Sequence, residues 1–143
     1  MLIADLNLLL YATNSDVTQH ERARQWWESA LRGDEIVGLA WTVVLGFVRI
    51  ATNPRIMPSP LTCAQAVGVV GGWLAEPSVR VVEPTERHWG ILSGLLEGVG
   101  TAANLTSDAH LAALAIEHGA TLCSADRDFG RFKHLRWHNP LGD

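Results

Sequence analysis

The sequence predicts an α/β domain, a three-layer α/β/α sandwich with a mainly parallel central sheet. Short apolar runs alternate with longer segments of helical composition, as in parallel sheets whose helices cover both faces. The 143 residues predict one domain spanning 1–143. Apolar residues make up 48% and charged residues 18%, a balance that excludes disorder and supports a well-filled core.

The first third of the chain predicts a strand, a helical region and a second strand. Residues 2–4 form a short apolar strand that leads into Asp5. The segment 18–31 mixes strong helix formers with an apolar stripe, and Gly33 ends it. Residues 36–40 predict a second, buried strand.

The middle of the chain predicts two more helices and a third strand. Thr42 is expected to cap a helix that ends before Asn53, because a residue that precedes proline disfavours the helical conformation. Thr62 is expected to cap a further helix that extends to Leu74. The β-branched run 79–82 lies between two prolines, which suits a short strand.

The last third completes the alternation. Residues 87–96 predict a helix, and the segment 107–118, rich in alanine and leucine, predicts another that Gly119 closes. A strand is expected at 121–123 and an edge strand at 135–137.

Composition also bounds where the protein works. No apolar run approaches the roughly 20 residues of a membrane-spanning helix, and the first residues lack the features of a secretory signal. Cys63 and Cys123 lie far apart without metal-ligand spacing, so we expect a reduced, cytoplasmic protein. The net charge of −4 argues against bulk coating of nucleic acid, though not against cleavage at a local site.

Three aspartates are expected to meet at one edge of the sheet. Asp5 follows the first strand and Asp126 follows the strand 121–123, so both lie at the carboxyl edge of a parallel sheet. Asp108 lies in the first turn of the helix before that strand, and a crossover helix begins at the same edge. The topology therefore brings three carboxylates together.

Each aspartate has an ordinary structural alternative, as a strand end, a helix first turn or a turn residue. Together, three carboxylates at one edge repel one another unless a cation neutralises them, which favours a functional site. All-oxygen ligation without histidine or cysteine points to Mg²⁺ or Mn²⁺. The expected chemistry is hydrolysis at phosphorus, with Asp5, Asp108 and Asp126 as metal-binding and catalytic residues.

Four segments of the chain resemble the PIN-domain family, and more narrowly the VapC-type toxins of toxin–antitoxin pairs. They are Ala4–Ala12, Phe47–Arg55, Asp108–Ala115 and Ser124–Phe129, and the pattern closes with Leu135-Arg136-Trp137. The resemblance implies a metal-dependent endoribonuclease that a cognate VapB-type antitoxin inhibits, with RNA as substrate and a homodimer as the working form. It places Asp5, Asp108 and Asp126 on the acidic metal positions, with Asn7 and Asp128 as supporting groups behind them.

Gly46 departs from the family pattern, because many PIN nucleases carry a glutamate at this position. Three explanations remain open: close helix packing, for example at a dimer contact; a natural subgroup with three aspartates; or an inactivating substitution. The hypothesis from the sequence is that Gly46 weakens occupancy of one metal site without destroying the other. It also keeps open a catalytically impaired PIN domain that only binds antitoxin or RNA.

The tail that follows Asp126 contains two candidate RNA contacts. Arg127 and Arg131 are expected to contact RNA phosphates.

A phosphatase or a response-regulator receiver is a third functional class for a carboxylate-metal α/β domain. Both need a phosphorylatable aspartate with a nearby lysine. Lys133 is the only lysine in the chain, which argues against this class.

Overall fold

The protein folds around a five-stranded parallel sheet with the strand order β3-β2-β1-β4-β5. The computed structural model describes residues 1–100 and 102–142. The prediction of an α/β fold with a mainly parallel sheet is confirmed. The strands are β1 Leu2–Ala4, β2 Val37–Ala40, β3 Val79–Val82, β4 Thr121–Cys123 and β5 Trp137–His138.

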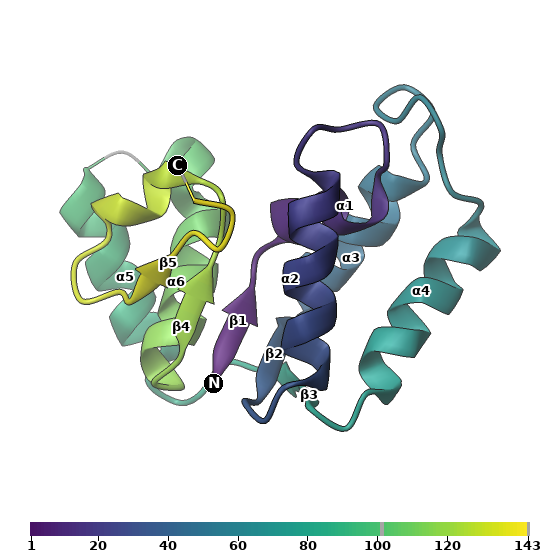
Figure 1. The fold of residues 1–143 in the computed structure, drawn as a ribbon. Coiled ribbons are helices and arrows are strands. Elements are labelled where there is room, and N and C mark those ends of the chain that lie inside the picture. The colour runs from purple at the N-terminus through teal and green to yellow at the C-terminus, as the bar shows by residue number, and fades with distance from the viewer. Residues whose placement is uncertain (101, 143) are drawn as a thin grey trace.

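Helices cover both faces of this sheet (Figure 1). Right-handed crossovers place the helices between β1 and β3 on one face, and those between β3 and β4 on the other. The first group comprises α1 Leu6–Thr13, α2 His20–Arg32, α3 Trp41–Ala51 and α4 Cys63–Ala75. The second comprises α5 His88–Val99, η1 Ala103–Leu105 and α6 Thr106–Glu117, and a short turn, η2 Arg127–Arg131, follows β4.

Two helix starts show where local signals succeed and fail. Thr62 caps α4 as predicted, in a reciprocal capping box with Gln65. The expectation for Thr42 is wrong: α3 begins at Trp41, and its cap is the extended Ala40, two residues before Thr42. Strand β2 runs directly into α3, so Thr42 lies inside the first turn and makes no capping hydrogen bond.

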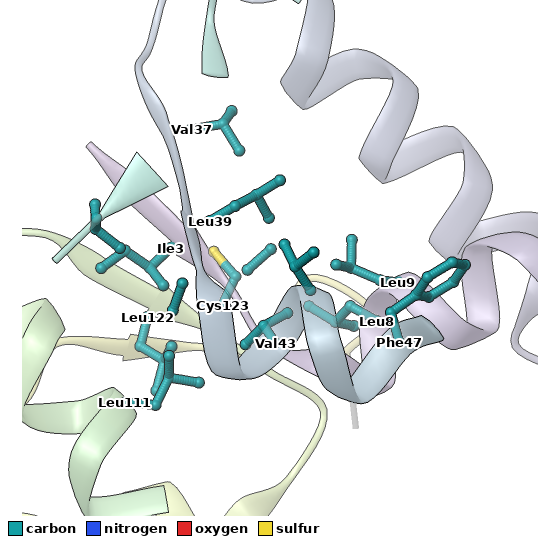
Figure 2. Close-up of a cluster of buried hydrophobic side chains, with 14 of the residues drawn as sticks. Ile3, Leu8, Leu9, Val37, Leu39, Val43, Phe47, Leu111, Leu122 and Cys123 are labelled. Carbon is teal, nitrogen blue, oxygen red and sulfur yellow. The ribbon is translucent and has the colours of Figure 1, made fainter. Parts of the chain in front are cut away.

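The core lies on both faces of the central strands. Ile3 and Leu122 are fully buried, and Figure 2 shows Leu8 and Phe47 on one side of the sheet and Leu111 on the other. Trp27 is also buried, because its ring packs edge-on against Trp73 at 5.6 Å. Within the part of the chain described, no helix is long and apolar enough to span a bilayer.

Candidate active site

Asp5 and Asp126 lie side by side at the carboxyl edge of the sheet, as predicted. β1 and β4 pair in parallel with Ala4 opposite Cys123, and the Asp5 amide donates to the Cys123 carbonyl at 2.9 Å. Asp5 caps α1, where its Oδ1 accepts a hydrogen bond from the Leu6 amide at 2.7 Å. Asp126 caps η2 in the same way, with Oδ1 accepting from the Asp128 amide.

Ser124 joins the two aspartates. Its hydroxyl donates to Asp5 Oδ2 at 2.6 Å and accepts from the Asp126 amide at 3.0 Å. Asn7 Nδ2 lies 3.4 Å from the Ser124 hydroxyl oxygen. Ser124 is fully buried, so these contacts are shielded from water. No role for Ser124 was expected from the sequence. The available signal was a small polar residue between a buried strand and an aspartate.

The charges at this edge interact. Burial raises the pKa of Asp108 to about 6, and the negative charges of Asp126, Asp5 and Asp128 add to the rise. Burial also raises the pKa of Asp5, and the charge of Asp126 adds to that rise. Hydrogen bonds from Ser124 and Leu6 act in the opposite direction. The three carboxylates are therefore close enough to influence one another, from three separate elements.

The donor set at this edge suits a hard divalent cation. None of the ion pairs in the described part of the chain involves Asp5, Asp108 or Asp126, so their repulsion is not relieved by a basic side chain. Carboxylate oxygens are the ligands that Mg²⁺ and Mn²⁺ prefer. The side chains do not form a preformed cage, since no three acidic, histidine or cysteine side chains among the described residues are arranged to hold an ion.

The residues predicted to support the site fall into two groups. Asn7 lies in the first turn of α1 and contacts both Ser124 and the Ala125 amide, so it helps to join α1 to the turn after β4. Asp128 is exposed, and its carboxylate lies 3.7 Å from Arg131 Nε. Arg127 is exposed beside Asp126, whereas Arg131 lines a groove along α5.

Gly46 packs against the first residue of α1. An added Cβ would lie 2.8 Å from Leu6 Cδ2, which is the far end of a flexible side chain. Leu6 is the neighbour of Asp5, so a longer side chain at position 46 would extend toward the acidic edge. Packing against Leu6 inside the chain is therefore one reason for a glycine at this position, and a larger side chain would require the Leu6 side chain to move.

His110 takes part in a structural network. Its Nδ1 lies 2.9 Å from His88 Nε2, and His88 Nδ1 lies 2.5 Å from Glu117 Oε2. The Glu117 side chain is fully shielded and also accepts from the Thr85 amide. The network fastens the start of α5 to α6, the helix that carries Asp108, in agreement with a structural role for His110.

Fold and site together define a class: a parallel α/β domain with an acidic edge whose oxygen donors suit a divalent cation. A family model described as the PIN domain matches residues 2–135. Ribonuclease VapC37 of Mycobacterium tuberculosis is 49% identical over 140 residues, which are 98% of this chain and 97% of that protein. Ribonuclease VapC33 of the same species is 44% identical over 141 residues, 99% of each chain. The protein belongs to the PIN-domain family, as a VapC ribonuclease of a type II toxin–antitoxin system.

Solved structures share the fold at much lower sequence identity. VapBC2 of Rickettsia felis, bound to a DNA fragment of its promoter, matches with a TM-score of 0.71 and 17% identity, covering 96% of this chain and 97% of that one. VapC20 of Mycobacterium tuberculosis, a toxin that cleaves the sarcin–ricin loop, matches with a TM-score of 0.69 and 17% identity, covering 95% and 99%.

Proposed function

We propose that this VapC ribonuclease hydrolyses RNA phosphodiester bonds at the edge formed by Asp5, Asp108 and Asp126. The observation that carries the proposal is the convergence of three carboxylates: the Ser124 hydroxyl joins Asp5 to the Asp126 amide, and the charges of Asp126 and Asp5 add to the burial that raises the pKa of Asp108 to about 6. Such mutual repulsion is relieved when a divalent cation binds. A bacterial ribonuclease of this kind would act in the cytoplasm.

Mg²⁺ or Mn²⁺ would be held by the three aspartates, and a bound ion would supply an activated water and stabilise charge at the phosphate. The protein groups have distinct tasks. Ser124 keeps Asp5 oriented through the bond to Oδ2, and the Leu6 amide fixes the other oxygen. Asn7 braces Ser124, while Asp128 adds negative charge near Asp108. Arg127 and Arg131 supply positive charge to RNA phosphates.

The test is RNA cleavage by single aspartate variants. Asp5→Asn, Asp108→Asn and Asp126→Asn should each lower Mn²⁺-dependent cleavage of structured RNA by at least about 100-fold, the scale on which losing one transition-state contact slows an enzyme. Asp34→Asn is the matched control, because Asp34 is exposed near the opposite edge of the sheet. Calorimetric titration with Mn²⁺ should show the same ranking without RNA. Full activity of the Asp5 variant would contradict the proposal.

The alternative is a catalytically impaired PIN domain that acts by binding antitoxin or RNA. Gly46 favours it, since the glycine stands where many PIN nucleases carry a glutamate. The same experiment separates the two functions, because an impaired domain would show no difference between the wild-type protein and Asp5→Asn while both bind the antitoxin.

The partners we propose are a cognate VapB-type antitoxin and a second copy of the chain. Structures similar in fold include toxin–antitoxin complexes from several bacteria. Support for a homodimer comes from α3, where Trp41 is 47% exposed and Leu45, one turn later, is 64% exposed. Light scattering should give a dimer mass for the wild type, and the double variant Trp41→Ser/Leu45→Ser should give a monomer.

A further inference from the structure

A small hollow opens beside the acidic edge, where β2 and β3 end. It measures about 250 Å³ and is lined by the last residues of these strands, Ala40 and Val82, together with His110 of α6. Pockets for drug-sized ligands usually measure roughly 300–1,000 Å³, so this hollow suits a single ring system. None of the three proposed metal-binding aspartates lines it. It is therefore a separate site.

The register of the sheet sets this hollow next to Asp5. Ile3 pairs with Gly38, and Ala40 pairs with Val82. Two residues after Ile3 and Gly38, the chain reaches Asp5 and Ala40, so Asp5, Ala40 and Val82 form one row across the carboxyl edge. Neighbouring strands lie about 5 Å apart, so the hollow begins one strand away from Asp5. An RNA nucleotide with its phosphate at the acidic edge can therefore place its base in the hollow.

The His110 ring has an unpaired acceptor. The Glu117 carboxylate accepts from His88 Nδ1, so His88 Nε2 accepts in turn from His110 Nδ1, at 2.9 Å. A neutral ring that carries its proton on Nδ1 has a lone pair on Nε2. No hydrogen bond within the described part of the chain reaches His110 Nε2, and the buried side-chain atom without a partner there is Trp27 Nε1. His110 Nε2 is therefore open to solvent, on a residue that lines the hollow.

Glu83 supplies a second acceptor. It follows β3 and lines the hollow, and its carboxylate takes part in none of the ion pairs of residues 1–100 and 102–142. The His118 ring donates to its backbone carbonyl at 2.8 Å, which holds this segment against the end of α6. None of the described lining residues is a lysine or an arginine. A ligand that fits here must therefore bring its own N–H donors.

Two acceptors side by side distinguish among the RNA bases. Guanine has two neighbouring donors, N1–H and the N2 amino group, on its Watson–Crick edge. Adenine and cytosine have an amino group beside an acceptor nitrogen, and uracil has a single N–H between two carbonyls. Unpaired bases in RNA are commonly stacked on aromatic rings and read along this edge. Trp41, which is 47% exposed, also lines the hollow and offers such a ring.

We propose that this hollow binds the guanine base of the nucleotide next to the scissile phosphate. The N1–H and the amino group of the base donate to His110 Nε2 and the Glu83 carboxylate, and the base stacks on Trp41. His110 and Glu83 are thus specificity-determining residues, and the network that ends at Glu117 fixes the ring of His110. The inference rests on the proposed function, which supplies RNA as the substrate.

The first test determines which bases flank the cut in RNA that carries randomised loops. The wild type should cut next to guanine at least about tenfold more often than next to any other base, the discrimination expected of a paired contact to a base edge. Glu83→Gln replaces an acceptor oxygen by an amide donor and should abolish this preference. Glu86→Gln is the matched control, because Glu86 is exposed three residues later and does not line the hollow. Thermal unfolding checks that each variant is folded.

Base analogues test the contact from the side of the RNA. Inosine at the preferred position lacks the N2 amino group and should lower kcat/KM at least about tenfold for the wild type, but not for Glu83→Gln. 7-Deazaguanosine differs from guanosine only on the opposite edge and should be cleaved equally well.

Nucleoside binding tests the hollow without catalysis. Guanosine, titrated into the metal-free wild type, should shift the NMR signal of the Trp41 indole N–H, which is the signal missing from Trp41→Phe. Inosine should need at least about a tenfold higher concentration for the same shift, and Glu83→Gln should bind both nucleosides equally weakly.

The outcomes are distinct. A preference for guanine that Glu83→Gln loses and Glu86→Gln keeps supports the proposal. Equal cleavage at all bases by the wild type, or an unchanged preference in Glu83→Gln, overturns the base site and leaves the proposed function intact. A wild type that cleaves no RNA overturns the proposed function, and the guanosine titration then decides whether the hollow binds a base. The proposal also fails if Glu83→Gln changes only the oligomeric mass, because the hollow then belongs to a contact with a second copy.

Discussion

The Ser124 hydroxyl donates a hydrogen bond of 2.6 Å to Asp5 Oδ2, although 119 residues separate the two side chains in sequence. This bond lowers the pKa of Asp5 against the larger effect of burial, which raises it. Ser124 therefore keeps a half-buried carboxylate available in its charged form.

Ser124→Ala should weaken the site without moving the backbone. Without the hydroxyl, the pKa of Asp5 rises further and the Asp126 amide loses its acceptor. We expect weaker Mn²⁺ binding and a loss of about 1–3 kcal/mol in the free energy of unfolding, the usual cost of an unsatisfied buried group. Calorimetry and urea denaturation measure the two effects. Ser124→Thr retains the hydroxyl and should behave like the wild type; equal behaviour of the alanine variant would remove Ser124 from the site.

Asp108 should make the metal-free protein less stable as the pH rises. Its pKa of about 6 in the folded protein exceeds its ordinary 3.8, so folding favours the protonated form. The free energy of unfolding should therefore fall between about pH 4 and pH 6.

Asp108→Asn should flatten this slope and stabilise the metal-free protein at pH 7. The gain should be about 1 kcal/mol, well below the full value of the shift because the half-exposed group is screened by solvent. Urea denaturation from pH 4 to pH 8 measures it. Added Mg²⁺ should then stabilise the wild type more than the variant. A wild-type slope that the substitution leaves unchanged would contradict this account.

Gly46→Glu should tighten metal binding. The new side chain would start beside Leu6, whose flexible end can move aside, and would extend toward Asp5. We expect half-maximal RNA cleavage at a lower Mn²⁺ concentration. Gly46→Gln has the same shape without the charge and serves as the control. If the glutamate variant has unchanged activity and metal affinity, Gly46 does not limit the occupancy of a metal site.

Glu117→Gln should destabilise the protein at neutral pH. Burial alone raises the pKa of Glu117, but hydrogen bonds from the Thr85 amide and His88 outweigh it and lower the pKa overall. The ionised carboxylate therefore stabilises the fold above its ordinary pKa of 4.5, and this contribution is lost as the pH falls through the lower folded value.

The loss should be about 1.5–3 kcal/mol at pH 7, the range for hydrogen bonds to charged groups, and it should shrink in acid. Urea denaturation at pH 7 and pH 3.5 provides the comparison. Glu86→Gln, at an exposed position, should change little. An equal loss at both pH values would show that the charge of Glu117 is not what stabilises α5 against α6.

The strands and the acidic edge follow from local patterns, but the links between them do not. Residues 79–82 and 121–123 are strands with the predicted bounds, because β-branched or apolar runs between turn signals are local features. The prediction that Thr42 caps α3 failed because the strand-to-helix junction at Ala40 needs no polar cap. The edge strand lies at Trp137–His138 rather than 135–137, since its register depends on pairing with β4. The role of Ser124 could not be predicted, because it depends on a hydrogen bond to Asp5, and only the folded chain brings the two residues together.

β1 contains some of the first residues made, yet it lies at the middle of the sheet. Its neighbour β4 pairs Leu2 with Thr121 and is synthesised near the end. A nascent chain arrested before that point holds Asp5 and Asp108 but has no strand beside β1 and no Ser124 or Asp126. Premature translation products should therefore have no ribonuclease activity.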